Sequence, residues 1–208
     1  GLGEKGTISP KVKAPFLLAG INHIGNPDFL TRGFWLEEGR FADKEFYDWM
    51  ARNKLNFWPG SDPAVHTLKK LGIKFTDGGH EVMYRCLNPQ SQYPYNHPDF
   101  ESDNDLPKDV YPVSESYLGD DNSDGKLSYH EAHPEWFGLI NGKRSEELRS
   151  LTTGDNYCTT NEDATKELTK NIILSLKDGE YKYTDILNVW LLDNGRWCEC
   201  NNCTQLKS

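Results

Sequence analysis

Residues 120–131, with the sequence DDNSDGKLSYHE, carry oxygen-bearing side chains at the spacing of a calcium-binding loop. In a twelve-residue loop of this kind the ligands come from positions 1, 3, 5, 7 and 12, and position 6 is glycine. Gly125 stands at position 6, and the ligand positions are occupied by Asp120, Asn122, Asp124, Lys126 (through its carbonyl oxygen) and Glu131. The pattern therefore predicts a structural calcium ion. An acidic, solvated turn is the alternative, because turns use the same residue types.

Four of the five cysteines form a second group with metal-binding potential. Cys198, Cys200 and Cys203 make a C-x-C-x2-C pattern, and Cys158 could complete a tetrahedral four-thiolate zinc site. Zinc is one interpretation of this group. A disulfide and a set of buried free thiols are the other two. Thiol catalysis is disfavoured, because no nearby His or Asn is arranged as the partner of a nucleophilic cysteine.

Polar and aromatic side chains also stand where apolar segments end. Imidazole offers a donor and an acceptor for sugar hydroxyls, and a carboxyl group can act as an acid or a base. Tryptophan rings at such positions can stack on flat sugar faces. The candidates for ligand contact are Glu37, Glu38, Trp58, His80, Asp193, Asn194 and Trp197. Each has a structural alternative: an acidic turn before a helix, a core ring, a hydrogen-bonded histidine, or an Asp-Asn-Gly turn.

The elements that must position these residues alternate along the chain. Apolar runs predict strands and amphipathic runs predict helices, in the order strand 32–38, helix 42–56, strand 56–58, helix 64–72, strand 73–80, helix 161–179 and strand 184–193. Asn161 or Thr160 is expected to cap the long helix. Residues 81–150 are expected to interrupt this alternation of strands and helices as an irregular insertion. The predicted fold class is α/β: about the first four strands of a (β/α)8 barrel, with the calcium-loop insertion after the third strand.

Amino-acid composition narrows the classes of binding partner expected for this protein. The 208 residues carry a formal net charge of −9, and 12% of them are aromatic. No basic stripe is available to neutralise phosphates, so nucleic-acid binding is disfavoured. No apolar run approaches the ~20 residues of a membrane-spanning helix. Residues 1–14 are expected to be a linker, and residues 15–208 the ordered domain.

Several motifs in this arrangement resemble a known family. They are RGFWLEEGRFADKEFYDWMARNKLNFW, the GGH after the third predicted strand, HPEWFGLINGKR, YCTTNED and DNGRWCECNNC. Together they resemble the barrel domain named domain of unknown function 4838, which is associated with glycoside hydrolase family 163 of gut bacteria. The resemblance implies a barrel hydrolase that acts on N-acetylglucosamine-containing glycans such as N-glycans, with the substrate's acetamido group as a nucleophile. It also implies a protein exported to the periplasm or surface of a bacterium.

Two functional hypotheses follow. Glycoside hydrolysis usually needs two carboxyl groups beside the scissile bond, and Asp193 is the candidate for one of them. Nothing matches the second half of a barrel, so the chain is expected to be a fragment of the enzyme. The alternative is a noncatalytic, calcium-stabilised carbohydrate-binding module, because a fold does not determine a function. A carbohydrate is the expected ligand in both cases.

Overall fold

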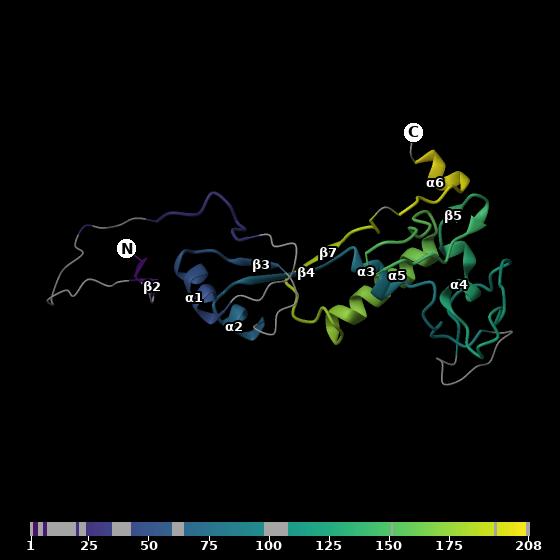
Figure 1. Cartoon of the computed structure of the whole chain (residues 1–208), viewed down its shortest axis with the longest axis horizontal. Coiled ribbons are helices and arrows are strands. Elements are labelled where there is room, and N and C mark those ends of the chain that lie inside the picture. Colours follow the sequence, from purple (N-terminus) through teal and green to yellow (C-terminus); the bar gives the residue numbers. More distant parts are fainter. Residues whose placement is uncertain are drawn as a thin grey trace. The chain divides into compact units, whose positions relative to one another are not determined.

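The structure is a computed structural model, and it describes residues 2–3, 6–7, 20, 24–34, 43–59, 65–97, 108–150, 152–193 and 195–206 (Figure 1). The chain divides into two compact units. The first unit comprises Gly1–Asp77 with Tyr183–Ile186, and the second comprises Gly78–Lys182 with Leu187–Ser208. Two strands, β4 and β7, therefore begin in the first unit and end in the second.

The first unit contains the regular alternation of strands and helices. Its elements are β1 (Leu2–Gly3), β2 (Gly6–Thr7), α1 (Lys44–Arg52), β3 (Phe57–Pro59), α2 (Val65–Lys70) and the start of β4 (Lys74–Gly79). Helix α1 begins where Asp43 accepts a hydrogen bond from the Phe46 N–H, as an N-cap should. Strands β1 and β2 pair in antiparallel fashion. The predicted order of helices and strands over residues 43–79 is thus observed.

The sheet is parallel where its pairing is defined. Strand β3 pairs with β4 in parallel, and the strand order is β3-β4-β7, with β7 at Ile186–Val189. Gly33 adds an isolated parallel bridge to Phe57 on the far edge of β3. Neighbouring parallel strands joined by helices are the expected pattern of an α/β fold. The α/β class is therefore confirmed.

An apolar cluster holds the first unit together. Its buried members are Tyr47, Met50, Trp58, Val65, Leu68, Ile73 and Phe75. These residues come from one face of α1, one face of α2 and the strands between and after them, as amphipathic spacing requires. Trp58 is 2% exposed and packs edge-on against Tyr47, so its ring is a core residue here.

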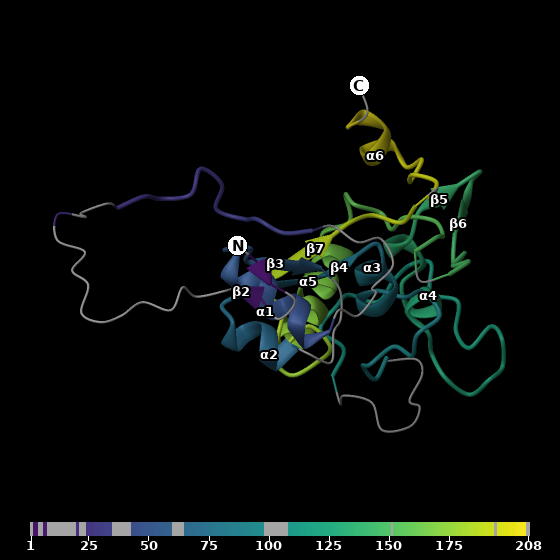
Figure 2. The same cartoon turned by 60° about the vertical axis from the view of Figure 1, so that its left-hand side comes forward.

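The second unit has short elements around one long helix. They are α3 (Glu81–Cys86), α4 (Tyr129–Ala132), a 3-10 turn (Pro134–Trp136), β5 (Leu139–Ile140), β6 (Lys143–Arg144), α5 (Glu162–Lys177) and α6 (Asn201–Gln205). Asn161 caps α5 by accepting a hydrogen bond from the Ala164 N–H. Helix α3 packs against α5, and the two lie side by side in Figures 1 and 2.

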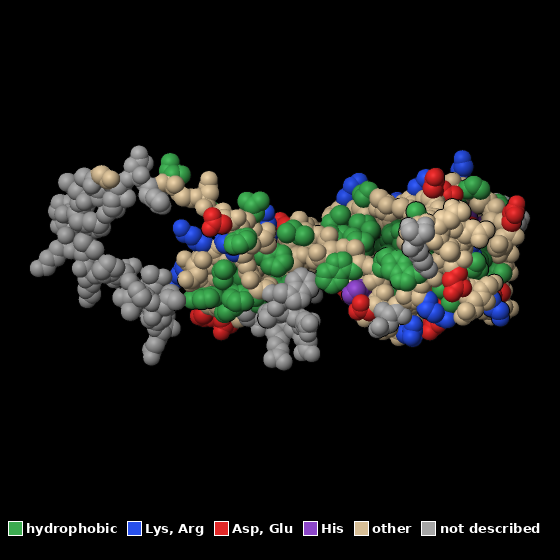
Figure 3. Space-filling model, turned by 90° about the horizontal axis from the view of Figure 1, so that it is seen from above, with side chains coloured by type: hydrophobic (Ala, Val, Ile, Leu, Met, Phe, Trp, Pro, Cys, Tyr) green, Lys and Arg blue, Asp and Glu red, His purple; other side chains and the backbone are tan. Residues whose placement is uncertain are grey.

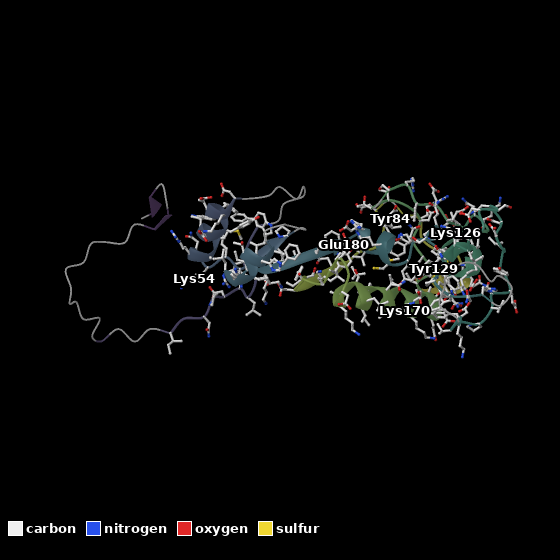
Figure 4. All side chains as sticks on the ribbon, turned by 90° about the horizontal axis from the view of Figure 1, so that it is seen from below. Lys54, Tyr84, Lys126, Tyr129, Lys170 and Glu180 are labelled. Carbon is white, nitrogen blue, oxygen red and sulfur yellow. The ribbon has the colours of Figure 1, made fainter. Side chains whose placement is uncertain are left out.

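A buried carboxylate organises the core of the second unit. Glu167 on α5 is fully buried, and it accepts hydrogen bonds from the hydroxyls of Tyr95 (3.0 Å), Tyr111 (2.7 Å) and Tyr129 (2.7 Å). Lys170 forms an ion pair with it at 2.6 Å. Tyr129 and Lys170 are labelled in Figure 4, where they lie in the same part of this unit. These buried polar groups of the core thus have specific hydrogen-bonding partners, and apolar packing surrounds them.

The HPEW sequence of the resemblance also lies in this core. The His133 ring stacks on Trp136 at 4.2 Å, and its two nitrogens lie 3.0 Å from the Tyr93 hydroxyl and 3.0 Å from Glu135. His133 and Trp136 are each 1% exposed. These side chains therefore pack in the interior of the second unit.

The charges on the surface and the lengths of the helices bear on the partners of this protein. Acidic and basic side chains are interspersed on the face of the second unit seen in Figure 3, without a large basic patch. Among the helices within the described ranges, none is both long and apolar enough to cross a membrane.

Candidate functional site

His80 and Asp193, predicted separately at the ends of two strands, meet in the second unit. Nε2 of His80 lies 3.1 Å from Oδ1 of Asp193. His80 follows the last residue of β4, and Asp193 lies four residues beyond the end of β7. Carboxyl ends of adjacent parallel strands share one edge of the sheet, so side chains that follow them can converge. Both are accessible, with 25% and 56% of their side chains exposed.

The partners of the His80 ring fix where one proton must be. Nδ1 contacts the backbone carbonyl oxygen of Leu191, which can only accept, so Nδ1 carries a hydrogen. A contact between Nε2 and the Asp193 carboxyl then needs one further proton, on the ring or on the carboxyl group. The pair is therefore a solvent-accessible contact between an imidazole and a carboxyl group. Groups that hold a transferable proton beside solvent can act as a general acid or base.

Gly78 and Gly79 help to bring this pair together, because they let the backbone of β4 lie close to the backbone of β7. Both have positive φ, +87° and +108°. A Cβ atom at Gly78 would lie 2.4 Å from the carbonyl oxygen of Asn188 on β7. The group that approaches these glycines is therefore the neighbouring strand β7.

The segment that carries Asp193 runs beside residues 152–158. Thr153 and Asp193 form an isolated parallel bridge, and the Asn156 N–H donates to the Arg196 carbonyl oxygen at 3.1 Å. Arg196 also donates to both carboxylate oxygens of Asp155, at 2.9 and 2.8 Å. Burial opposes ionisation of Asp155, but these hydrogen bonds hold its pKa below the ordinary value. The position of Asp193 thus depends on contacts from a segment 40 residues earlier in the chain.

Aromatic rings lie beside the pair and near the C-terminus. The Trp190 ring packs edge-on against His80 at 5.0 Å and is 40% exposed, and Trp197 is 49% exposed. Exposed rings of this size offer stacking faces. Trp197 was among the predicted ligand-contact residues, whereas Trp190 was not. Trp190 lies within an apolar run, three residues before Asp193. Glu37, Glu38 and Asn194 lie outside the described residues.

Internal hydrogen bonds turn the 120–131 loop tightly. Asp120 accepts from the N–H groups of Asp124 (2.9 Å) and Gly125 (2.9 Å), and Asn122 accepts from Asp124 N–H (2.8 Å). Gly125 has a φ of +80°, which a glycine at position 6 permits without strain. Leu127 is 1% exposed and anchors the loop in the core of the second unit.

An acidic cavity of about 390 Å³ adjoins this loop. Its carboxyl groups come from Asp121, Asp124, Glu131 and Glu146. A hydrogen bond with Glu131 raises the pKa of Asp121, which is the expected result when two carboxyl groups lie close together. Asp121 and Glu146 were not among the predicted ligands, because only tertiary structure shows that they face the same cavity.

The four predicted cysteines come together in the second unit. Their Sγ atoms all lie within 4.8 Å of one another, and Cys158 Sγ lies 3.8 Å from the Sγ atoms of both Cys200 and Cys203. All four are free thiols. They form a cluster with Leu139 packed against it. Among the described residues, these four cysteines are the group of three or more Cys, His, Asp or Glu side chains that lie close enough to share an ion.

Comparison with known proteins finds a match for part of the chain. Residues 120–208 match the family model described as Domain of unknown function (DUF4838). This range contains the loop 120–131, the HPEW sequence and the C-x-C-x2-C pattern. No curated protein and no solved structure matches the chain. The resemblance to the DUF4838 family is therefore confirmed over residues 120–208.

Proposed function

We propose that the chain is part of a glycoside hydrolase that acts on N-acetylglucosamine-containing glycans. The observation that carries the proposal is the His80–Asp193 pair, an exposed carboxyl–imidazole contact of 3.1 Å at the carboxyl ends of β4 and β7. In a partial (β/α)8 barrel this is the edge at which substrates bind. The resemblance of the C-terminal part to the DUF4838 family adds support.

Each residue of the pair has a defined role in this proposal. Asp193 supplies one of the two carboxyl groups that glycoside hydrolysis uses, and His80 positions it. Leu191 holds the imidazole through its carbonyl oxygen, which keeps Nε2 directed at Asp193. The exposed Trp190 ring beside His80 offers an apolar face to a sugar.

The test is release of sugar from an N-glycan by the full-length gene product and by this chain. Asp193→Asn should lower turnover at least ~100-fold in whichever form is active, because it removes an acid–base group. Asp178→Asn is the matched control, since Asp178 is an exposed carboxyl at the C-cap of α5. An Asp193→Asn protein that retains full turnover would exclude the catalytic role.

A second candidate function is a noncatalytic carbohydrate-binding module. The observation that favours it is the exposure of Trp190 and Trp197, at 40% and 49%. Binding of the same glycan without any product, equal in the wild type and Asp193→Asn, would support the module. In that case Trp190→Ala should weaken binding.

For either function we propose a structural calcium ion at the 120–131 loop. The turn geometry around Gly125 and the acidic cavity support this, because Ca²⁺ prefers six to eight oxygen ligands from carboxylates and carbonyls. The ion would draw the predicted ligands together and replace apolar packing that this loop lacks. The proposed ligands remain Asp120, Asn122, Asp124, Lys126 through its carbonyl oxygen, and Glu131.

A further inference from the structure

The proposed glycan chemistry makes no use of the four-cysteine cluster. We infer that Cys158, Cys198, Cys200 and Cys203 bind one Zn²⁺ ion in a closed, tetrahedral site. This inference is independent of the proposed hydrolase activity.

The distances between the sulfur atoms distinguish a metal site from a disulfide. Four thiolates bound to one zinc at ~2.3 Å form a tetrahedron whose edges are ~3.8 Å. Cys158 Sγ lies 3.8 Å from two of its partners, and all four sulfurs lie within 4.8 Å of one another. Bonded sulfur atoms in a disulfide are instead ~2.05 Å apart. The cluster is thus spaced for four bonds to a shared ion.

Hydrogen-bond donors surround the sulfurs. The Leu139 N–H donates to Cys198 Sγ at 3.3 Å, and the Arg144 guanidinium lies 3.8 Å from the same sulfur. The Cys203 N–H donates to Cys200 Sγ at 3.5 Å. Donors of this kind stabilise metal-bound thiolates. Arg144 also offsets part of the net negative charge that four thiolates and one divalent ion would carry.

Zinc binds cysteine as the thiolate. Binding to a protonated thiol would therefore break its S–H bond, form a Zn–S bond and release the proton to solvent. No oxidant or reductant is needed.

The position of the cluster indicates a structural ion. Cys158 precedes α5, whereas the other three cysteines follow β7. The pairing of Thr153 with Asp193 and of Asn156 with Arg196 keeps an offset of 40 residues, which Cys158 and Cys198 continue. Zinc would fix the end of this pairing. Because all four ligands come from the protein, no position is left for a substrate.

The first experiment measures zinc per chain by elemental analysis of the purified full chain. One zinc per chain is expected. Cys158→Ser and Cys203→Ser should each lose at least ~10-fold in zinc affinity. Cys86→Ser is the matched control, because Cys86 is a buried free thiol in the apolar core outside the cluster. It should keep its zinc. A wild-type chain without zinc, or with iron in its place, would overturn the inference.

A second measurement avoids any dependence on whether the variants fold. Zinc is removed from the wild-type chain by a chelator, and Co²⁺ is added in its place. A tetrahedral four-thiolate site should give intense visible cobalt bands and thiolate-to-cobalt absorption in the near ultraviolet. Added Zn²⁺ should abolish both. The weak spectrum of an octahedral cobalt ion would overturn the assignment, and neither result depends on the hydrolase activity.

Discussion

Both units of this protein have an apolar core, and the second adds a network of buried polar side chains to it. In the first unit, apolar side chains from α1, α2 and the strands form one cluster around Met50 and Trp58. In the second unit, the core contains a fully buried glutamate with three tyrosine hydroxyls, a buried histidine and four clustered cysteines. The stability of an apolar cluster depends mainly on the volume that its side chains fill. The stability of a buried polar group depends on the identity of each hydrogen-bonding partner. The second unit should therefore be the more sensitive to conservative substitutions.

The largest expected effect is that of Glu167→Ala. Removing this carboxylate leaves the hydroxyls of Tyr95, Tyr111 and Tyr129 without their acceptor, so we expect a loss of ~3–5 kcal/mol in the free energy of unfolding. Chemical denaturation measures this. Glu162→Ala on the same helix is the control, because the Glu162 side chain is 89% exposed and should matter by less than ~0.5 kcal/mol. Equal effects of the two substitutions would refute the proposed role of Glu167.

Substitutions at Met50 and Glu167 test the comparison directly. Met50 is fully buried, so Met50→Ala should cost ~2–5 kcal/mol, but Met50→Leu less than ~1.5 kcal/mol. Glu167→Gln keeps the volume, yet it places an amide donor among hydroxyl donors and should cost ~1–3 kcal/mol. If Glu167→Gln were as well tolerated as Met50→Leu, the distinction between the two cores would fail. Denaturation midpoints of the four variants provide the measurement.

Calcium should stabilise the second unit. At about a hundred times its dissociation constant, Ca²⁺ should add ~2.7 kcal/mol, which appears as a higher melting temperature that a chelator reverses. Glu131→Gln should remove most of this response, because it removes the charge and the bidentate ligand at position 12. Glu115→Gln, an exposed glutamate in a neighbouring loop, should respond like the wild type. A wild-type melting curve indifferent to both calcium and chelator would leave the loop as a polar turn.

Acid should weaken the second unit by a smaller amount. Burial opposes ionisation of Glu167, yet hydrogen bonds from Lys170 and two tyrosines hold its pKa below the ordinary 4.5. The unfolded chain therefore binds a proton more readily, and the stability present above about pH 4.5 is lost as pH falls through the lower folded pKa. Melting temperatures between pH 7 and pH 3 should fall less steeply in Glu167→Gln than in the wild type. Identical slopes would show that Glu167 contributes nothing to acid sensitivity.

The sequence by itself predicted α1, α2, α5 and the strands β3, β4 and β7, because their signals are local. Of the two caps expected for α5, Thr160 and Asn161, Asn161 is the one observed. The positions of His80 and Asp193 after apolar segments were likewise readable. In each case the physical cause lies within a few neighbouring residues, so periodicity and capping suffice.

Tertiary structure alone decided which distant residues meet. Glu167 reads as a surface residue of an amphipathic helix, but tyrosines 38 to 72 residues earlier in the chain converge on it. The 3.1 Å contact of His80 with Asp193, the packing of Trp190 beside it and the approach of Cys158 to the C-x-C-x2-C pattern are further examples. The spacing of residue types along the chain indicates which side chains could take part in a site. Which of them share a buried space depends on how the irregular segment 81–150 and the segment after β7 fold against α5, and no local pattern encodes that.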